Sequence, residues 1–217
     1  MFFRYLATDP HFFVYAVVTM VFSTVLHELA HGWAALWQGD PTPHDSGHMT
    51  VDPRVHMGWP SLVLLVMTGM CFGAMPVDRT RFRSRYGDLI VSAAGPLMNL
   101  ALALVALTAC GIWQMRGDEA DLVGDNLRHF LWVFGYCNVA LAIFNLVPIP
   151  PLDGSSALAN VHRGYARAIA SVTNPSVFLI ALFAVLALFN LHANGLYGIG
   201  TDLAGAYLRA LHGLLGR

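Results

Sequence analysis

Long apolar runs, separated by short polar segments, dominate the pattern of this 217-residue chain. Three of them, residues 12–37, 88–113 and 129–147, approach or exceed the roughly 20 residues that a helix needs to cross a bilayer. A single segment within lipid can satisfy its own backbone polar groups only as a helix. The pattern therefore predicts an all-α polytopic membrane protein with three long membrane-spanning helices.

Shorter apolar segments accompany the three long ones. Residues 61–75 would extend only about 22 Å as a helix, against a hydrocarbon core of about 30 Å, so we expect a short re-entrant segment there. Residues 176–191 form a further apolar run. Residues 196–215 are apolar at helical spacing but carry interrupting charges, which fits either a last span or a helix lying in the interface. One or two C-terminal membrane helices are thus expected over about 175–215.

The composition agrees with a membrane protein. Hydrophobic residues make up 56% of the chain and charged residues 12%, with a formal net charge of -1 and a mean hydropathy of +0.57. Soluble chains carry about a quarter charged residues. The four arginines between residues 79 and 85 are typical of a cytoplasmic topology anchor, with a nucleic-acid or lipid patch as the alternative. We expect a multi-pass protein of the cell (inner or plasma) membrane and no nucleic-acid partner.

The first apolar run contains a compact cluster of ionisable residues, His27-Glu28-Leu29-Ala30-His31. On a helix, His27 and His31 lie one above the other on a single face, where both can bind one metal ion. Glu28 projects beside that face, in the place of the carboxylate that accepts a proton from water in metalloproteases. The alternative is two core histidines and an unrelated acid. Burial of such a cluster at membrane depth is costly, so we interpret it as functional and expect this span to be retained rather than cleaved as a signal.

A catalytic zinc site needs a third protein ligand, and Asp153 is the best candidate. It follows Pro148, Pro150 and Pro151, which prevent a regular helix, and broken helices at membrane depth are tolerated where they line a cavity. The alternative is a solvated aspartate in a helix-ending turn. If the span after the arginine cluster leaves the cytoplasm, the following span returns, and Asp153 lies near the cytoplasmic side. For His27 and His31 to meet Asp153, the first span must run from outside to inside. Residues 61–75 then enter and leave on the cytoplasmic side, and the active site faces that side.

In three motifs the chain closely resembles the site-2 protease family of intramembrane zinc metalloproteases: His27-Glu28-Leu29-Ala30-His31, Gly95-Pro96-Leu97-Met98-Asn99, and Asn145-Leu146-Val147-Pro148-Ile149-Pro150-Pro151-Leu152-Asp153-Gly154. The resemblance implies a three-helix catalytic core over about residues 11–158 and one Zn²⁺ held by the counterparts of His27, His31 and Asp153. It also implies Glu28 as the catalytic carboxylate. Family members often carry a PDZ or CBS domain, and no stretch here is long enough for either. We therefore expect a minimal form, a single domain over residues 1–217.

These observations predict a zinc metalloendopeptidase that hydrolyses peptide bonds within or near transmembrane segments, as in regulated intramembrane proteolysis. Its partners would be the lipid bilayer and a transmembrane protein or peptide substrate, while a regulatory membrane partner or a homo-oligomer stays open. A substrate helix must unwind, and Asn99 and Asn145 are candidates to bind its extended backbone or, alternatively, to fasten helices together. Another membrane metallohydrolase, a non-catalytic metal-binding scaffold and a transporter are the alternative functions. The ligand set also suits iron, cobalt or manganese.

Overall fold

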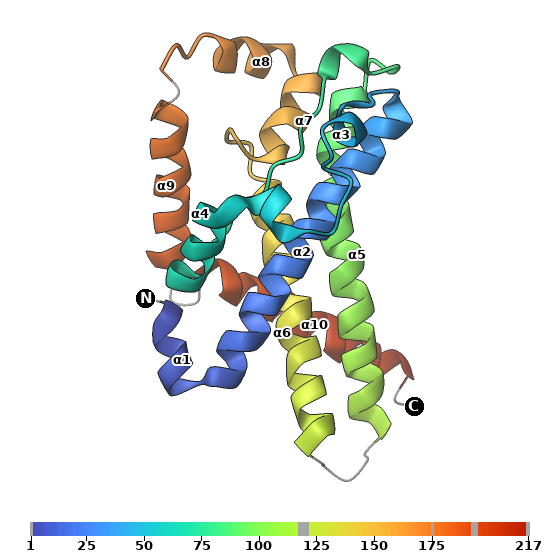
Figure 1. The fold of residues 1–217 in the computed structure, drawn as a ribbon. Coiled ribbons are helices and arrows are strands. Elements are labelled where there is room, and N and C mark those ends of the chain that lie inside the picture. Colours follow the sequence, from blue (N-terminus) through green and yellow to red (C-terminus); the bar gives the residue numbers. More distant parts are fainter. Residues whose placement is uncertain (1, 117–121, 175, 192–194, 216–217) are drawn as a thin grey trace.

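The computed structural model describes residues 2–116, 122–174, 176–191 and 195–215, and within these ranges the regular structure is helical. Three helices in this part of the chain are long and apolar enough to cross a membrane: α2 (Pro10–Gln38), α5 (Gly87–Arg116) and α6 (Leu122–Asn145). They pack against one another as the long blue, green and yellow helices of Figure 1. The prediction of an all-α polytopic membrane protein is confirmed.

The ends of the long helices follow from local chemistry. α2 begins behind Asp9, whose side chain accepts a hydrogen bond from the Phe12 amide, and it ends at Gly39 in the left-handed conformation (φ +95°), as capped helices commonly do. α6 begins at Leu122 rather than at residue 129, because the polar turn before its apolar run is itself helical. It ends at Asn145, short of the proline-rich segment that cannot continue a helix.

Small and apolar side chains join the long helices to α10 (Gly195–Leu215) in one buried cluster. Leu107 of α5, Cys137 of α6 and Ala204 of α10 all lie in it. Gly135 lets α6 approach α5 closely, since a Cβ at this position would collide with the Leu107 side chain, and small residues play this part in membrane helix pairs. The cluster holds α10 across α6 and α5 (Figure 1).

The segment between α2 and α5 leaves the three-helix core and returns to the same end of it. It comprises α3 (Thr42–Asp45), α4 (Pro53–Thr68) and the 3-10 turn η2 (Arg79–Arg81). On the return, the Asp78 amide donates to Asp40 Oδ2 at 2.7 Å, and the Arg83 amide donates to Gln38 O at 2.8 Å. Figure 1 shows the resulting dip of α4 along the core. This course is the one expected for a re-entrant segment.

α4 consists of two helical pieces joined at a kink at Gly58 (φ +66°), and the second piece, which ends at Thr68, covers the start of the predicted segment 61–75. Asp52 caps α4 by accepting from the Arg54 amide, and Gly69 ends the helix in the left-handed conformation (φ +79°). Residues 70–78 are not helical and carry the chain back toward α5. The apolar run thus contains the end of a helix and the start of its return, which hydropathy alone does not distinguish.

Five further helices complete the described chain: η1 (Phe2–Arg4), α1 (Tyr5–Thr8), α7 (Asp153–Val161), α8 (Arg163–Ala170) and α9 (Ser176–Leu191). Neither α9 nor α10 is among the helices that are long and apolar enough to cross a membrane. Their place in the membrane therefore stays a prediction.

Candidate metal centre

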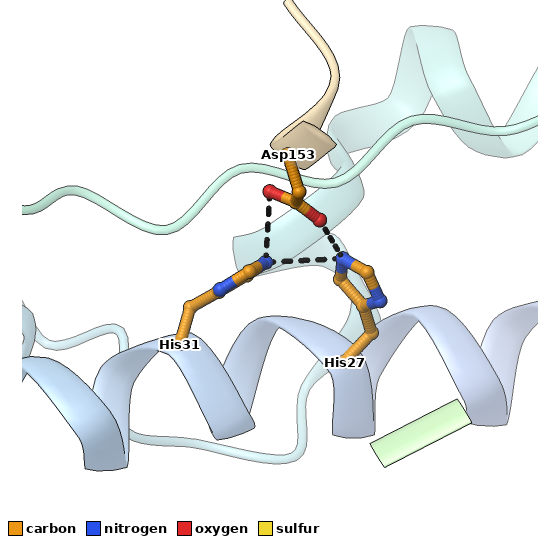
Figure 2. Close-up of side chains that lie close together, drawn as sticks. All are labelled: His27, His31 and Asp153. Carbon is orange, nitrogen blue, oxygen red and sulfur yellow. Dashed lines mark hydrogen bonds and ion pairs between the residues drawn. The ribbon is translucent and has the colours of Figure 1, made fainter. Parts of the chain in front are cut away.

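Three side chains from two distant parts of the chain converge on one point. His27 and His31 lie one turn apart on α2, and their Nε2 atoms are 3.0 Å from each other. Asp153, the first residue of α7, places Oδ2 3.0 Å from His27 Nε2 and Oδ1 3.3 Å from His31 Nε2. Figure 2 shows the two rings and the carboxylate pointing at one another. All three offer a ligand atom within 4.8 Å of the others.

The proline-rich break places Asp153 beside α2. After α6 ends at Asn145, the chain turns and starts α7 at Asp153. Gly154 permits this tight return, because a Cβ there would collide with the backbone carbonyl of Leu146. Tyr165 of α8 fastens the turn, donating from its hydroxyl to Pro148 O at 2.7 Å. The break therefore brings the start of α7 back to the end of α6.

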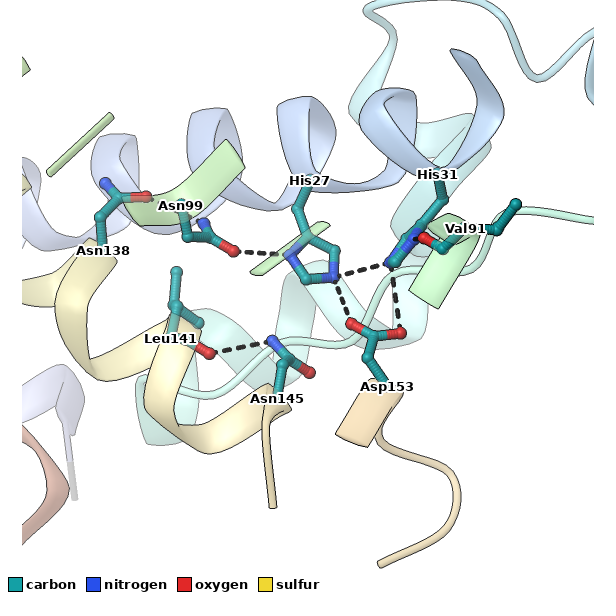
Figure 3. Close-up of polar contacts among 8 residues, drawn as sticks. All are labelled: His27, His31, Val91, Asn99, Asn138, Leu141, Asn145 and Asp153. Atoms are coloured by element: carbon teal, nitrogen blue, oxygen red, sulfur yellow. Dashed lines mark hydrogen bonds and ion pairs between the residues drawn. The ribbon is translucent and has the colours of Figure 1, made fainter. Parts of the chain in front are cut away.

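The hydrogen-bond partners of the two imidazoles leave both Nε2 atoms as acceptors. His31 Nδ1 lies 2.6 Å from Val91 O, and because a carbonyl can only accept, Nδ1 carries the proton. His27 Nδ1 lies 2.5 Å from Asn99 Oδ1, which is likewise an acceptor. Each neutral ring therefore directs the Nε2 lone pair toward Asp153 (Figure 3).

This donor set fits a divalent metal ion. Two lone pairs and a carboxylate repel one another unless a cation lies between them. Asp153 Oδ2 is buried and has no hydrogen-bond donor among the described residues, as expected of an atom that binds an ion rather than a proton donor. Two imidazoles and one carboxylate form a ligand set of catalytic zinc sites, with one position left open.

Gly95 makes room for the two rings. It belongs to α5, and a Cβ there would lie 2.5 Å from Nε2 of both His27 and His31. Only a residue without a side chain lets α5 pass this close to the centre. The family motif drew attention to this glycine, and the structure supplies its physical reason.

Glu28 and the ligands line one cavity of about 550 Å³. Residues 71–75 form one wall and residues 151–153 another, and α9 contributes Leu182 and Phe183. Glu28 itself is 7% exposed and faces Gly73, where any Cβ would collide with its carboxylate. A carboxylate, three candidate ligands and space for a substrate therefore occupy the same place.

The two asparagines singled out from the sequence have different surroundings, although both line the cavity. Asn99 is fully buried and uses both ends of its amide, since Oδ1 faces His27 and Nδ2 donates to Asn138 at 2.9 Å. Asn145 donates from Nδ2 to Leu141 O of its own helix at 3.1 Å. Its oxygen has no partner in the described part of the chain. The geometry favours the structural alternative for Asn99.

The histidines of the segment between α2 and α5, namely His44, His48 and His56, lie outside the centre. His44 is exposed, and His56 is buried with Nε2 donating to Thr50 O at 2.7 Å. Within the described ranges, the group of metal-binding side chains is His27, His31 and Asp153. Sequence reasoning did not single out Val91, whose contribution is a backbone carbonyl that no side-chain pattern reveals, or Asn138.

Comparison with known proteins found relatives with metalloprotease names. The profile of Peptidase family M50 matches residues 110–189. "Putative zinc metalloprotease YwhC" of Bacillus subtilis is 32% identical over 175 residues, which cover 79% of each chain. "Putative zinc metalloprotease Rip2" of Mycobacterium tuberculosis is 31% identical over 183 residues, covering 79% of this chain and 67% of the relative. No solved structure matches the chain.

Proposed function

Because this chain belongs to peptidase family M50, the site-2 protease family, we propose that it hydrolyses peptide bonds within or near the transmembrane segments of membrane proteins. Its relatives carry zinc metalloprotease names, and its three long apolar helices make it an integral membrane protein. The observation that carries the proposal is the convergence of His27, His31 and Asp153 in a cavity that Glu28 also lines.

In this proposal, His27, His31 and Asp153 hold one Zn²⁺. When bound, the ion supplies a Lewis acid that polarises a carbonyl group and acidifies water. Glu28 accepts the proton of the attacking water and returns it to the leaving nitrogen of the scissile bond. Its place in the cavity and against Gly73 supports this role, because a proton acceptor must lie within reach of the reacting atoms.

The non-helical residues 70–78, which include the cavity wall at 71–75, support a substrate that binds as an extended strand. The amides of Phe72, Ala74 and Asp78 donate to Ser61 Oγ, His56 O and Asp40 Oδ2. The amides of Gly73, Met75 and Val77 have no acceptor among the described residues, so alternate positions present free donors. Because an unwound transmembrane helix has unpaired backbone groups, this edge offers them partners in the manner of strand addition.

We further propose that the centre opens toward the cytoplasm. The part of the segment that returns to α5 contains four arginines: Arg79, Arg81, Arg83 and Arg85. The Arg83 amide donates to Gln38 O at the end of α2, and Arg79 reaches Ser156 of α7 at 3.1 Å. The arginines therefore lie at the end of the core from which α7 supplies Asp153. By the positive-inside rule, that end is the cytoplasmic one.

The test is cleavage of a panel of single-span membrane proteins by the purified chain in lipid vesicles. Wild type is compared with Glu28→Gln and Asp153→Asn, with and without a zinc chelator, and Glu119→Gln controls for loss of the only other glutamate. Glu28→Gln should retain zinc, but its cleavage rate should fall by at least about 100-fold, because a general base contributes about 10²–10⁴-fold. Asp153→Asn should lose both zinc and cleavage.

Mass spectrometry of the products locates the cleaved bond. Bonds within or next to the transmembrane segment support the proposal, and bonds confined to soluble domains contradict it. Zinc binding without chelator-sensitive cleavage of any panel member would favour a metal-binding scaffold or transporter. Full activity of Glu28→Gln would remove Glu28 from the mechanism.

A further inference from the structure

A second buried asparagine, Asn138 on α6, links all three long helices at their centre. It is fully buried, and its Nδ2 donates to Ser23 Oγ of α2 at 2.8 Å and to Phe134 O of its own helix at 2.9 Å. Its Oδ1 accepts from Asn99 Nδ2 of α5 at 2.9 Å. Figure 3 shows Asn138, Asn99 and His27 in line, leading to the candidate centre.

The direction of this chain of hydrogen bonds is fixed at its far end by a backbone carbonyl. Phe134 O can only accept, so Asn138 must turn its NH₂ group toward it and its oxygen toward Asn99. An oxygen at that position requires the NH₂ group of Asn99, whose own oxygen then faces His27 Nδ1. An acceptor there places the proton of the neutral ring on Nδ1. Each link therefore determines the next, and the last one leaves His27 Nε2 free to bind an ion.

The two histidines differ in how their protons are placed. His31 Nδ1 faces Val91 O directly, a backbone acceptor that no side-chain substitution removes. His27 Nδ1 faces Asn99, whose amide could turn over if nothing held it, because an amide presents an acceptor on one side and a donor on the other. A turned amide would direct NH₂ at Nδ1 and favour the proton on Nε2, where it would compete with the metal.

We propose that Asn138 is a positioning residue for the metal centre, acting through Asn99 to hold His27 in the tautomer that binds the ion. This inference rests on the proposed function only in assuming that the centre binds zinc. Groups that orient metal-binding histidines commonly contribute about 10–100-fold to metal affinity. Loss of Asn138 should therefore weaken zinc binding by about that factor, although Asn138 does not line the cavity.

The experiment measures zinc affinity of the purified full chain by competition with a chromogenic chelator. Asn138→Leu, of similar size, removes the whole link and should lower affinity about 10–100-fold. Ser23→Ala is the matched control, because it removes one hydrogen bond to the same NH₂ group but leaves Phe134 O to fix its direction. It should bind zinc within about twofold of wild type.

A double-mutant cycle separates positioning from general packing. If Asn138 acts through Asn99, the Asn99→Leu/Asn138→Leu double variant binds zinc no more weakly than Asn99→Leu alone. If Asn138 only supports helix packing, the two losses add, as for independent sites, and the proposal is overturned. Equal losses in Ser23→Ala and Asn138→Leu would overturn it as well.

A measurement on the unmutated protein covers the case in which Asn138→Leu does not fold. Nitrogen-15 NMR of labelled histidine in the zinc-free chain should show a proton on Nδ1 of His27, which faces Asn99 Oδ1, and an unprotonated Nδ1 would contradict the proposal. Different results would refute the proposed function and the positioning role of Asn138. A wild type that binds no zinc refutes the proposed function, whereas equal binding by wild type and Asn138→Leu refutes the positioning role alone.

Discussion

Gly95→Ala tests the geometry of the candidate centre because helix propensity and local packing predict opposite effects. A Cβ at this position lies 2.5 Å from Nε2 of both His27 and His31, whereas ordinary contact begins at 3.4 Å. Either the rings or α5 must therefore move by about 1 Å, while ligand distances in metal sites hold to about 0.2 Å. The substitution adds a single methyl group and introduces no charge or hydrogen-bonding group.

The rings cannot retreat without losing their partners. His27 Nδ1 is held by Asn99 and His31 Nδ1 by Val91 O. Overpacking of this kind costs about 1–3 kcal/mol, while alanine is favoured over glycine in a helix interior by about 1 kcal/mol. We therefore expect the free energy of unfolding to stay the same or to fall modestly. Zinc affinity should fall about 10-fold or more, because both ligands are displaced.

The assay pairs thermal unfolding in detergent with chelator competition for zinc. Gly213→Ala on α10 is the control, since a Cβ there has no neighbour within 4 Å. It should leave zinc affinity unchanged and the Tm equal or slightly higher. Wild-type zinc affinity in Gly95→Ala, together with a raised Tm, would show that α5 does not pass against the rings and would refute the reasoning.

Two further predictions concern the segment that returns to the end of α2. Single cysteines at Asp45 and Arg83, in a background without native cysteines, should react with an impermeant thiol reagent on the same side of sealed vesicles. A cysteine at Val123, which is exposed at the start of α6, should react from the other side. Labelling of Asp45 and Arg83 from opposite sides would exclude the re-entrant course. Asp40→Asn should lower the Tm, because the Asp40 carboxylate accepts a hydrogen bond from the Asp78 amide. The loss of a hydrogen bond at a buried group costs about 1–3 kcal/mol. Burial alone would raise the pKa of Asp40, but the hydrogen bonds that it accepts lower it below the ordinary value. Its stabilising effect is thus present at neutral pH and is lost as the pH falls through that lowered pKa, so the Tm gap between wild type and Asp40→Asn should narrow in acid.

Features set by local spacing could be predicted from the sequence. The apolar runs predicted the ends of α2, α5 and α6 to within a few residues, except for the start of α6. The spacing of His27 and His31 placed both on one helix face, because a helical turn brings residues four apart together. The bounds of α4 could not be predicted from hydropathy, since the Asp52 cap and Gly69 determine them.

Contacts between distant segments do not follow from local spacing. Asp153 is predictable because a catalytic zinc site needs a third ligand and the proline break offers a carboxylate at the right depth, which is a condition on the whole site rather than on any one stretch. The structure brings Asp153 to the two histidines. The role of Gly95 depends on how closely α5 crosses α2, and the amides free at residues 73, 75 and 77 depend on which neighbours take the others. Both follow from packing that no single segment encodes.

Three asparagines in the apolar parts of the long helices, Asn99, Asn138 and Asn145, show where sequence reasoning ends. Asn99, Asn138 and Asn145 each appear as one amide in an apolar run, and any of them is a candidate for substrate binding or helix association. Their partners separate them. Asn145 returns its NH₂ group to its own helix and leaves its oxygen beside the cavity, whereas both ends of the Asn99 and Asn138 amides reach another helix. Because the register of three helices decides which amide meets which, the same residue type presents a free oxygen to the cavity at one position and joins helices beside a candidate ligand at the others.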